Sequence, residues 1–470
     1  MNITNQAKCV IKKRFVRLAH NGTLNPTIKH HLAKSEPGEL IEARGFVKSV
    51  RKSKNIGFLD LADGTTSEDL KVVFQTKEQP KLRVGQTVAV NGEWAESKGK
   101  GQTRELRCNP QEPQHSYRII GDVEEDYPLQ KKSTSMQFLR TLPALKHRTS
   151  TIASFYRLRS FLETQMIDFF NINDFTKVTP PIITSSDCEG AGETFKIAES
   201  ANFFEKTTYL TVSTQLHIEA LAMALNRVWT LTPCFRAENS NTTRHLCEFW
   251  MLEAEISHVE DLEQLLNFTE DMIKYSTRKL IDLKNEYLRG VYLEEELVQS
   301  RWAAITKQEK WPRMTYTDAI EYLNKLRKDS EEKLEFGDSL LLEHEKYLAK
   351  DGPIFITDYP AEMKPFYMLK SAKFDPEKPT VACYDLLFPD FGELAGGSLR
   401  EHNYKELVES MGKHGMDVEE MDWYTTLRKN GTIPHGGFGM GWERFVTYLS
   451  GHDNVKDVIP FPRAPGLCKA

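Results

Sequence analysis

Two runs of alternating side chains, residues 228–234 and 248–256, constrain the fold of this chain more than any other feature. A period of two predicts β-strands, and the Asn, Ser and Thr residues between the runs predict a polar hairpin loop. On the returning strand, one face is then made of Phe249, Met251, Glu253 and Glu255. Successive side chains of a strand point to opposite faces, so an aromatic ring and carboxylates share one side of the predicted strand pair.

The same hairpin carries charged side chains that suit a nucleoside triphosphate. Guanidinium groups bind phosphate oxygens in pairs, and an aromatic face can lie against a base. The hairpin residues expected to bind in this way are Arg236, Glu238, Arg244, His245 and Phe249. Taken alone, they are equally well explained as a charged surface hairpin with satisfied ion pairs. The Gly-rich stretch from Gly436 to Arg444 shifts this balance toward a binding site.

Three ordered stretches resemble the motifs of class II aminoacyl-tRNA synthetases, in their asparaginyl form. FTKVTPPIIT, residues 175–184, is similar to motif 1, with Pro181 as its proline. FRAE, RHL and EFWM, within residues 235–251, resemble motif 2, and GFGMGWER, residues 437–444, resembles motif 3. The resemblance extends from about Gly38 to the C-terminus. It implies an α+β protein with an N-terminal OB-fold β-barrel and a catalytic domain built on an antiparallel sheet flanked by helices.

Composition separates the N-terminal 35 residues from the rest. Residues 1–35 hold seven Lys and Arg residues and no acid, whereas the whole chain has a formal net charge of -5. The remainder therefore carries about -12, so contacts with RNA must come from local basic surfaces. An acid-free basic segment predicts a mitochondrial transit peptide, and hence the mitochondrial matrix. The alternative is an unstructured basic arm that helps to hold RNA, with a cytoplasmic location.

Several classes of protein are disfavoured by patterns that the sequence lacks. The seven cysteines form no C-x-x-C pair, which argues against a zinc ribbon or a secreted disulfide framework. Neither G-x-x-x-x-G-K-[ST] nor G-x-G-x-x-G occurs, so neither a Walker loop nor a dinucleotide loop is supported. Because no apolar run approaches the length of a membrane span, we expect no membrane partner.

Residues 38–113 are expected to form the barrel. Short alternating runs predict four strands, at residues 41–50, 57–61, 70–74 and 87–94. In the second strand Phe58 shares the outer face with Asp60, while Leu59 and Leu61 point inward. Without further information, Phe58 is best explained as a partly covered rim residue.

The resemblance gives three barrel residues a role in binding the anticodon. In the synthetases for Asp, Asn and Lys this barrel binds the anticodon, and Phe58 takes the position of the Phe that stacks on it. Arg51 is suited to a neighbouring backbone or base contact. Lys71 stands where the family usually carries the Gln that reads the central uridine. Lysine donates hydrogen bonds but cannot accept them, so it cannot reproduce the two-way readout of an amide.

The rest of the chain is expected to be a hinge at residues 114–149 and a catalytic domain at 150–470. Apolar residues at helical spacing predict a helix over residues 150–170, and motif 1 follows it. The resemblance implies that this helix and motif 1 form the interface of a homodimer. Residues 258–348 show amphipathic helical patterns and are interpreted as an insertion on the catalytic sheet, without an assigned chemical role.

The amino-acid pocket is expected to begin at SDCEGAGE, residues 186–193. Glu189 and Glu193 can accept hydrogen bonds from an ammonium or a carboxamide group, although a solvated acidic turn is the simpler explanation in isolation. The resemblance makes Glu189 a candidate for the α-amino group of the substrate and Glu193 for its amide end. Further substrate contacts are expected from Ser213, Gln215, Glu253 and Arg400.

Ile218 argues for asparagine rather than aspartate as the substrate. Related aspartyl enzymes carry a lysine three positions after the glutamine of this segment, and that lysine neutralises the substrate carboxylate. Counting three positions from Gln215 reaches Ile218 in this chain. A buried aspartate side chain would be poorly compensated here, whereas a neutral carboxamide needs only hydrogen bonds.

Asp385 and Glu393 are the candidate ligands of Mg²⁺. They flank an extended segment and could share divalent cations with the phosphates of ATP. Two surface acids in a loop are the alternative, which is weakened because the segment resembles the metal-bearing strands of the family. Arg400 follows Glu393 by the family spacing of the arginine that grips the side-chain oxygen of the substrate.

The resemblance also assigns roles around ATP. Arg236 would hold the α-phosphate and Glu238 the adenine edge, while His245 and Arg444 would contact the outer phosphates or the base. Arg444 would lie over the adenine opposite Phe249. Arg236, Arg444 and His245 are therefore the candidate catalytic residues.

The expected activity is ATP-dependent activation of asparagine and its transfer to tRNA(Asn), with ATP and Mg²⁺ as cofactors. One alternative is an aspartyl or nondiscriminating synthetase, which Ile218 disfavours. The other is a non-catalytic paralogue that binds RNA. Such paralogues usually lose a motif 2 or motif 3 arginine, and both Arg236 and Arg444 are present.

Overall fold

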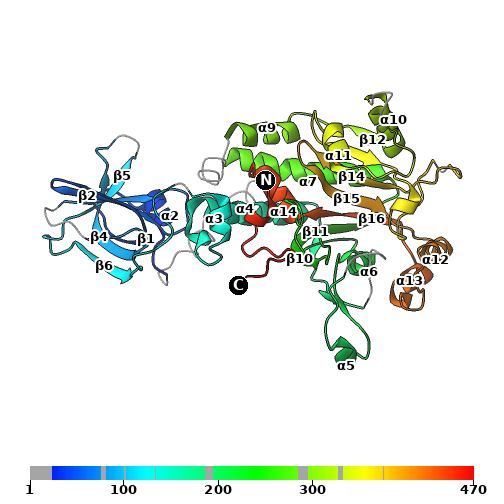
Figure 1. The fold of residues 1–470 in the computed structure, drawn as a ribbon, viewed down its shortest axis with the longest axis horizontal. Helices are drawn as coiled ribbons and strands as arrows, with labels where there is room; N and C mark the ends of the chain where they lie inside the picture. The colour runs from blue at the N-terminus through cyan, green and yellow to red at the C-terminus, as the bar shows by residue number, and fades with distance from the viewer. Residues whose placement is uncertain are drawn as a thin grey trace, which may run out of the picture. The chain divides into compact units, whose positions relative to one another are not determined.

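The computed structural model divides into two compact units, residues 1–135 and 136–470. Figure 1 shows the helices and strands of each, with labels on many of them. The structure describes residues 24–75, 81–99, 102–132, 134–185, 194–283, 295–326, 332–373 and 375–469. Each unit is built on a sheet of its own.

The first unit is a β-barrel closed by five strands, with a sixth strand at its edge. The strands are β1 (Leu40–Ser53), β2 (Ile56–Ala62), β3 (Leu70–Phe74), β4 (Thr87–Glu96), β5 (Arg104–Cys108) and β6 (Ser116–Gly121). β1 pairs with both β2 and β4, and β3 pairs with β5, so the circuit β1-β2-β3-β5-β4 closes on itself. Gly45 permits close approach of β1 and β2, because an added Cβ would lie 2.8 Å from the Ala62 carbonyl oxygen. This is the predicted OB-fold.

The alternation that predicted the barrel strands also fills its core. Leu59 and Leu61 of β2 are buried, as predicted. Phe58, which precedes them on the same strand, is exposed. The helix α2 (Ile28–Lys34) adds Ile28 to the same core. Thr27 caps this helix, with its side chain accepting a hydrogen bond from the backbone of the first turn. The segment predicted as a transit peptide, residues 1–35, therefore overlaps a helix that packs on the barrel core.

The barrel sheet is longer than the four strands predicted within residues 38–113. In β5 the neighbouring residues Glu105 and Leu106 are both buried, which breaks the alternation that marks a strand. β6 is exposed along nearly its whole length and is held by pairing with β4 rather than by burial. The sheet thus reaches Gly121, inside the predicted hinge, because backbone pairing alone leaves no hydrophobic pattern in the sequence.

The second unit is built on an eight-stranded sheet in the order β12-β13-β14-β15-β16-β11-β10-β7. Its strands are β7 (Thr176–Lys177), β10 (Arg227–Phe235), β11 (Glu248–Ser257), β12 (Arg313–Thr315), β13 (Ile354–Thr357), β14 (Cys383–Phe388), β15 (Gly392–Leu399) and β16 (His435–Gly441). A separate pair consists of β8 (Ile183–Thr184) and β9 (Tyr209–Leu210). The six strands from β13 to β10 pair antiparallel, which confirms the predicted catalytic sheet.

Helices surround this sheet (Figure 1). They are α3 (Met136–Arg140), α4 (Ser150–Ile172), α5 (Ser200–Phe204), α6 (Gln215–Leu225), α7 (Leu262–Asp282), α9 (Glu295–Thr306), α10 (Tyr316–Leu326), α11 (Leu342–Leu348), α12 (Tyr404–Lys413), α13 (Asp422–Lys429) and α14 (Trp442–Leu449), with 3-10 turns η1 (Lys146–Arg148), η2 (Ala361–Met363) and η3 (Val455–Asp457). α4 confirms the helix predicted at 150–170. Among the described residues, none of these helices combines the length and apolar character needed to cross a membrane.

An aromatic core fixes α4 and α7 to one face of the sheet. Phe170 of α4 stacks on Trp229 of β10 with 4.6 Å between the ring centroids, and Phe268 of α7 lies 6.2 Å from Phe438 of β16. Aromatic pairs at these separations stabilise a core beyond the area they bury. The opposite face carries the alternate side chains of β11 and is available for a binding site.

The region 258–348 does more than pack on the sheet. It contains the expected helices, but β12 also joins the sheet beside β13. Glu345 of α11 accepts a hydrogen bond of 3.1 Å from the backbone nitrogen of Glu393. The region therefore contacts a strand that carries a predicted metal ligand, although no chemical role is predicted for it from the sequence.

Candidate active site

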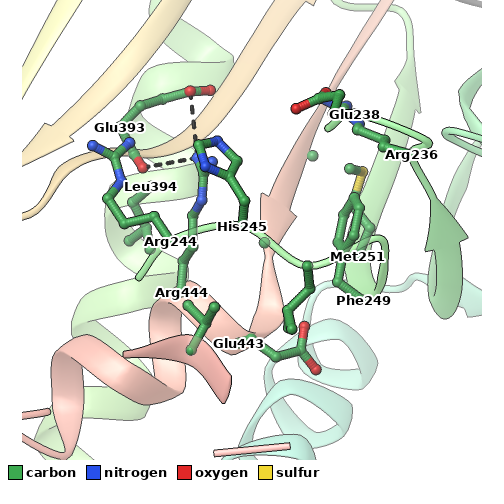
Figure 2. Close-up of a pocket in the computed structure, with 14 residues that line it drawn as sticks. Arg236, Glu238, Arg244, His245, Phe249, Met251, Glu393, Leu394, Glu443 and Arg444 are labelled. Carbon is green, nitrogen blue, oxygen red and sulfur yellow. Dashed lines mark hydrogen bonds and ion pairs between the residues drawn. The ribbon is translucent and has the colours of Figure 1, made fainter. Parts of the chain in front are cut away.

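Two adjoining cavities lie on the sheet face that carries Glu253. Their volumes are about 290 and 270 Å³. Both are lined by Arg236, Met251, Glu393 and Gly439. A single ligand can therefore extend from one cavity into the other. Figure 2 shows the first of them.

The first cavity gathers every residue predicted to bind ATP. These residues are Arg236, Glu238, Arg244, His245, Phe249 and Arg444. Figure 2 shows Arg236 and Glu238 across the cavity from Arg244 and Arg444. The Arg236 guanidinium lies 5.7 Å from the centroid of the Phe249 ring. Three guanidinium groups and an aromatic face around one space suit a polyphosphate joined to a flat base.

Positive charge is crowded at the far end of this cavity. Arg444 Nη1 donates to the carbonyl oxygen of Glu393 at 3.2 Å and to its carboxylate at 3.4 Å, as the dashed lines in Figure 2 show. Arg244 Nη1 lies 3.9 Å from the Glu345 carboxylate. Burial lowers the pKa of Arg244, and the nearby charge of Arg444 lowers it further. An anionic ligand would relieve this repulsion.

His245 is held as a hydrogen-bonding group. Its Nδ1 lies 2.6 Å from the Thr242 hydroxyl and 3.1 Å from the Ser240 hydroxyl. Burial lowers the pKa of His245 below its ordinary value, and the charge of Arg444 adds to the effect. The ring is therefore neutral near pH 7 and can contact a ligand without adding a charge to the three arginines.

The Gly-rich stretch forms β16 and the start of α14. An added Cβ at Gly437 would collide with the Ala254 carbonyl oxygen of β11, so glycine allows these strands to approach. Glu443 follows on α14, where one carboxylate oxygen lies 2.7 Å from Arg159 Nη1 and the other accepts from Trp250 N at 2.9 Å. Glu443 thus connects α4, β11 and α14 beside the cavity, a role that the sequence did not indicate.

The second cavity contains the predicted substrate and metal residues that the structure describes. They are Ser213, Gln215, Glu253, Arg400, Asp385 and Glu393. Ile218 also lines this cavity, as the argument for asparagine requires. Glu189 and Glu193 lie outside the described residues.

Glu253 organises the start of α6. Its carboxylate accepts hydrogen bonds from the Ser213 hydroxyl, and from the Thr214 hydroxyl and backbone nitrogen, the last at 3.1 Å. Burial raises the pKa of Glu253 even though these donors oppose the shift. The carboxylate therefore orients Ser213, another residue of the cavity lining, in addition to lining the cavity itself.

Arg400 and Glu255 form a buried pair at the second cavity. Arg400 donates from Nε at 3.1 Å and from Nη2 at 2.9 Å to the two oxygens of Glu255, and from Nη1 at 2.6 Å to the Ser398 hydroxyl. These contacts use three of the five N–H donors of a guanidinium. Burial raises the pKa of Glu255, while the charge of Arg400 opposes the rise. Both side chains line the cavity.

The two candidate metal ligands converge on one space. A Cβ placed on Gly396 would lie 3.4 Å from Asp385 Oδ1 and 3.7 Å from Glu393 Oε1. Lys364 Nζ binds both oxygens of Asp385, at 2.9 and 2.8 Å. Burial raises the pKa of Asp385, whereas for Glu393 the charges of Arg444 and Lys364 outweigh burial and lower the pKa. Two converging oxygen ligands suit a hard divalent cation.

Three charged residues that line the cavities were not singled out from the sequence. Glu255 lies on the strand face that alternation defined, so the pattern located it without assigning a role. Lys364 and Glu443 contact partners that lie in other segments of the chain, and no sequence spacing predicts these contacts. They become visible only when the strands are placed side by side.

The predicted anticodon residues lie on one outer face of the barrel. Phe58 is 39% exposed, and the Arg51 guanidinium lies 5.9 Å from its ring centroid. Lys71 Nζ contacts Asp60 at 2.8 Å, and Ser49 donates to the same carboxylate. Asp60 thus fixes Lys71 two residue positions from Phe58 along the paired strands.

Comparisons with known proteins agree with this geometry. Residues 135–465 match the family described as tRNA synthetases class II (D, K and N), and residues 41–113 match the OB-fold nucleic acid binding domain. The mitochondrial asparagine--tRNA ligase of Saccharomyces cerevisiae is 44% identical, over 90% of this chain and 92% of its own. The corresponding protein of Schizosaccharomyces pombe is 42% identical, over 91% and 95%.

A solved structure extends the likeness to the fold of the whole chain. Asparaginyl-tRNA synthetase from Pyrococcus horikoshii, complexed with asparaginyl-adenylate, has a TM-score of 0.83 at 27% identity, covering 96% of this chain and 100% of its own. The family model covers the unit that holds both cavities, and the relatives match nearly end to end. The chain therefore belongs to the class II tRNA synthetases (D, K and N), and within them to the asparagine--tRNA ligases.

Proposed function

We propose that the chain activates asparagine with ATP to form asparaginyl-adenylate and then transfers the asparaginyl group to tRNA(Asn). The observation that carries this proposal is the buried Arg400–Glu255 pair. A carboxamide accepts hydrogen bonds at its oxygen and donates them from its NH2 group. Arg400 can donate to the first and Glu255 can accept from the second. Ile218 lines the same cavity and brings no cation to balance a substrate carboxylate.

The names of similar proteins support the same substrate. The relatives from Saccharomyces cerevisiae and Schizosaccharomyces pombe are called asparagine--tRNA ligases. The structures from Pyrococcus horikoshii and Entamoeba histolytica are described as complexes with asparaginyl-adenylate. Such a ligand would span an amino-acid cavity and a nucleotide cavity that adjoin, as the two cavities of this chain do.

In the proposed reaction, a carboxylate oxygen of asparagine attacks the α-phosphorus of ATP. The bond to the bridging oxygen breaks and pyrophosphate leaves. Arg236 lines both cavities, so it can hold the α-phosphate where they meet. Arg244 and the neutral His245 face the outer phosphates. Fixed donors of this kind stabilise the developing charge because they need no reorganisation when it forms.

The adenine would lie beside the Phe249 ring. Arg444 lies on the opposite side of the cavity and can cover the other face of the base (Figure 2). Glu238 can accept from the exocyclic amino group at the adenine edge. Phe249, Arg444 and Glu238 therefore act as binding residues for the base, whereas Arg236 contacts the reacting phosphate.

Asp385 and Glu393 would hold Mg²⁺. An oxygen of each lies within 4 Å of the position that a Cβ on Gly396 would take, and glycine leaves that space open. Bound there, the ion would neutralise the charge of the phosphates. Lys364 already neutralises Asp385 in this structure, so Lys364 and the ion would compete for the same carboxylate.

The α-amino group of asparagine would be held near Ser213 and Gln215, which line the second cavity. Glu253 supports this end by orienting Ser213. Glu189 remains a proposed ligand of the α-amino group, and Glu193 a proposed neighbour of the amide end. Both belong to residues 186–193, which precede the lining residues of this cavity in the sequence.

We further propose a homodimer formed through motif 1. Apolar side chains are exposed at the end of α4 and in motif 1, where Ile172 is 69%, Ile182 37% and Ile183 44% exposed. Exposed apolar side chains that cluster along one surface favour association with another protein surface. A mitochondrial location is supported by the acid-free basic N-terminal segment and by the names of the fungal relatives.

The test is amino-acid-dependent exchange between ATP and pyrophosphate, comparing asparagine, aspartate and lysine. We expect exchange with asparagine alone. Arg236→Ala should lower it by about 10²–10³, because a positioned charge at the α-phosphate is lost. Arg227→Ala is the matched control, since Arg227 lies at the other end of β10 and donates to Asn173 instead. Equal exchange with aspartate would indicate a nondiscriminating enzyme. Failure with all three amino acids would favour the RNA-binding paralogue.

A further inference from the structure

A fully buried carboxylate, Glu219 of α6, lies behind the second cavity. It is 0% exposed. One oxygen accepts from Arg428 Nη2 and from the Tyr424 hydroxyl, each at 2.7 Å, and lies 3.1 Å from His435 Nε2. The other oxygen accepts from Gln215 Nε2 at 3.0 Å. An ionised group at this depth persists only when it is this completely paired.

The charge of Glu219 reaches the cavity through two side chains that line it. Gln215 is bonded to Glu219 directly. Arg400 Nε lies 3.9 Å from Glu219, and oxygens of Glu219 and Glu255 lie within 4.8 Å of each other. Arg400 is therefore placed between two carboxylates, one inside the cavity and one behind it. Glu219 acts on a ligand through Arg400 rather than by contact.

The formal charges of this cluster balance. Glu219 and Glu255 contribute the negative charges, and Arg400 and Arg428 the positive ones. Burial would raise the pKa of Glu219, but Arg428 and His435 outweigh burial and hold the pKa below its ordinary value. A carboxamide adds no charge to this balance. An aspartate side chain would add a buried negative charge without a partner.

We propose that Glu219 is a specificity-determining residue whose buried negative charge excludes aspartate from the amide end of the cavity. This inference rests on the proposed activation of asparagine. It extends the argument from Ile218, which brings no cation: Arg400, proposed to contact the substrate side chain, is already paired with Glu255, and Arg428 behind it is already paired with Glu219. Discrimination then depends on the net charge of the cluster and not only on the residues that touch the substrate.

A series of charge variants tests the proposal. Glu219→Gln raises the net charge of the cluster by one, Arg428→Gln lowers it by one, and the double variant restores it. The measurement is the ratio of kcat/KM for asparagine to that for aspartate in ATP/pyrophosphate exchange. Glu219→Gln should lower the ratio about tenfold, the order of one unit charge acting through a partly screened interior. Arg428→Gln should not lower it, and the double variant should return it toward the wild-type value.

A structural role predicts a different outcome. Tyr424→Phe removes a hydrogen bond from the same Glu219 oxygen without changing any charge, so it should leave the ratio within about twofold. If all variants lose activity toward both amino acids in parallel, the ratio stays constant and the proposal is overturned. If Glu219→Gln folds poorly in thermal unfolding, Arg428→Gln and the double variant still differ by the Glu219 charge and give the same comparison. Wild-type protein without asparagine exchange would instead overturn the proposed function.

Discussion

At the scale of single residues, the candidate site holds its cations in ion pairs made by the protein itself. These pairs are Arg444–Glu393, Arg400–Glu255 and Lys364–Asp385. Most of these side chains are also proposed to bind a ligand. Arg400 and Glu255 would bind the substrate, Arg444 the nucleotide, and Asp385 and Glu393 the metal. The pairs keep these buried charges compensated. Binding would then exchange one partner for another and leave the number of compensated charges nearly the same.

His245 offers a test of the positive potential in the first cavity. The pKa of its free ring lies below the ordinary value because of burial and the nearby arginines. Bound phosphates would favour the protonated form and raise that pKa. A group whose pKa rises on binding takes up protons, so ATP binding should tighten as the pH falls toward 6. Titration calorimetry in two buffers of different ionisation enthalpy measures this uptake directly.

The control removes the imidazole but keeps a polar side chain of similar reach. ATP itself titrates in the same range, so the quantity of interest is the difference between wild-type protein and His245→Gln. We expect wild-type protein to take up a few tenths of a proton more. His414→Gln, on a histidine at the end of α12, should match the wild type. Equal uptake by wild type and His245→Gln would contradict the assignment.

Site residues could be predicted from the sequence where a local pattern determines the strand face on which they lie. Alternation alone placed Phe249 and Glu253 on one face, and the structure puts both in the cavities. Glu219 and Lys364 could not be found in this way. Glu219 meets Arg428 and His435, which arrive from segments about 200 residues later in the chain. No sequence spacing predicts these contacts of Glu219, because they form only in the folded protein.

At the scale of elements, β16 is a strand in which glycines are required for close packing. Its glycines let it lie against β11 and leave space above the sheet for ligands. At Gly437 an added Cβ would collide with backbone, the Ala254 carbonyl oxygen, which cannot rotate away. Gly437→Ala should therefore force β16 away from β11 and lower the free energy of unfolding by about 2–4 kcal/mol.

A second glycine gives the matched control. Gly412 lies in α12, and nothing comes within 4 Å of its added Cβ. Alanine in a helix is favoured over glycine by roughly 0.5–1 kcal/mol, so Gly412→Ala should be neutral or stabilising. Chemical denaturation of both variants measures the contrast. A Gly437→Ala protein as stable as Gly412→Ala would show that the two strands can separate at little cost.

The elements themselves were predictable where side-chain polarity follows the period of the helix or strand. α4, β10 and β11 show such a period and were predicted with nearly their observed ends, although consecutive residues are buried in both strands. β5 and β6 were missed since their pairing leaves no such period. β12 is three residues long and was not predicted for the same reason. Its place beside β13 depends on backbone hydrogen bonds rather than on a side-chain pattern.

At the scale of the whole molecule, the two units divide the proposed reaction between them. The cavities belong to residues 136–470, and the exposed Phe58 belongs to the barrel of residues 1–135. On this proposal, adenylate formation needs only the cavity side chains of residues 136–470, whereas tRNA binding also uses the barrel face that carries Phe58. Changes in the barrel should therefore alter aminoacylation without altering ATP/pyrophosphate exchange.

Phe58→Ala separates these two activities. Stacking of a base on an aromatic side chain contributes about 1–3 kcal/mol, so loss of the ring should raise the KM for tRNA about tenfold or more while exchange stays within twofold. Tyr117 of β6 is the matched control, because it is equally exposed, at 39%, on the same barrel. Tyr117→Ala should leave both activities near the wild-type level. Equal losses in Tyr117→Ala and Phe58→Ala would mean that the barrel binds tRNA through general surface contacts and not through the face that carries Arg51 and Lys71.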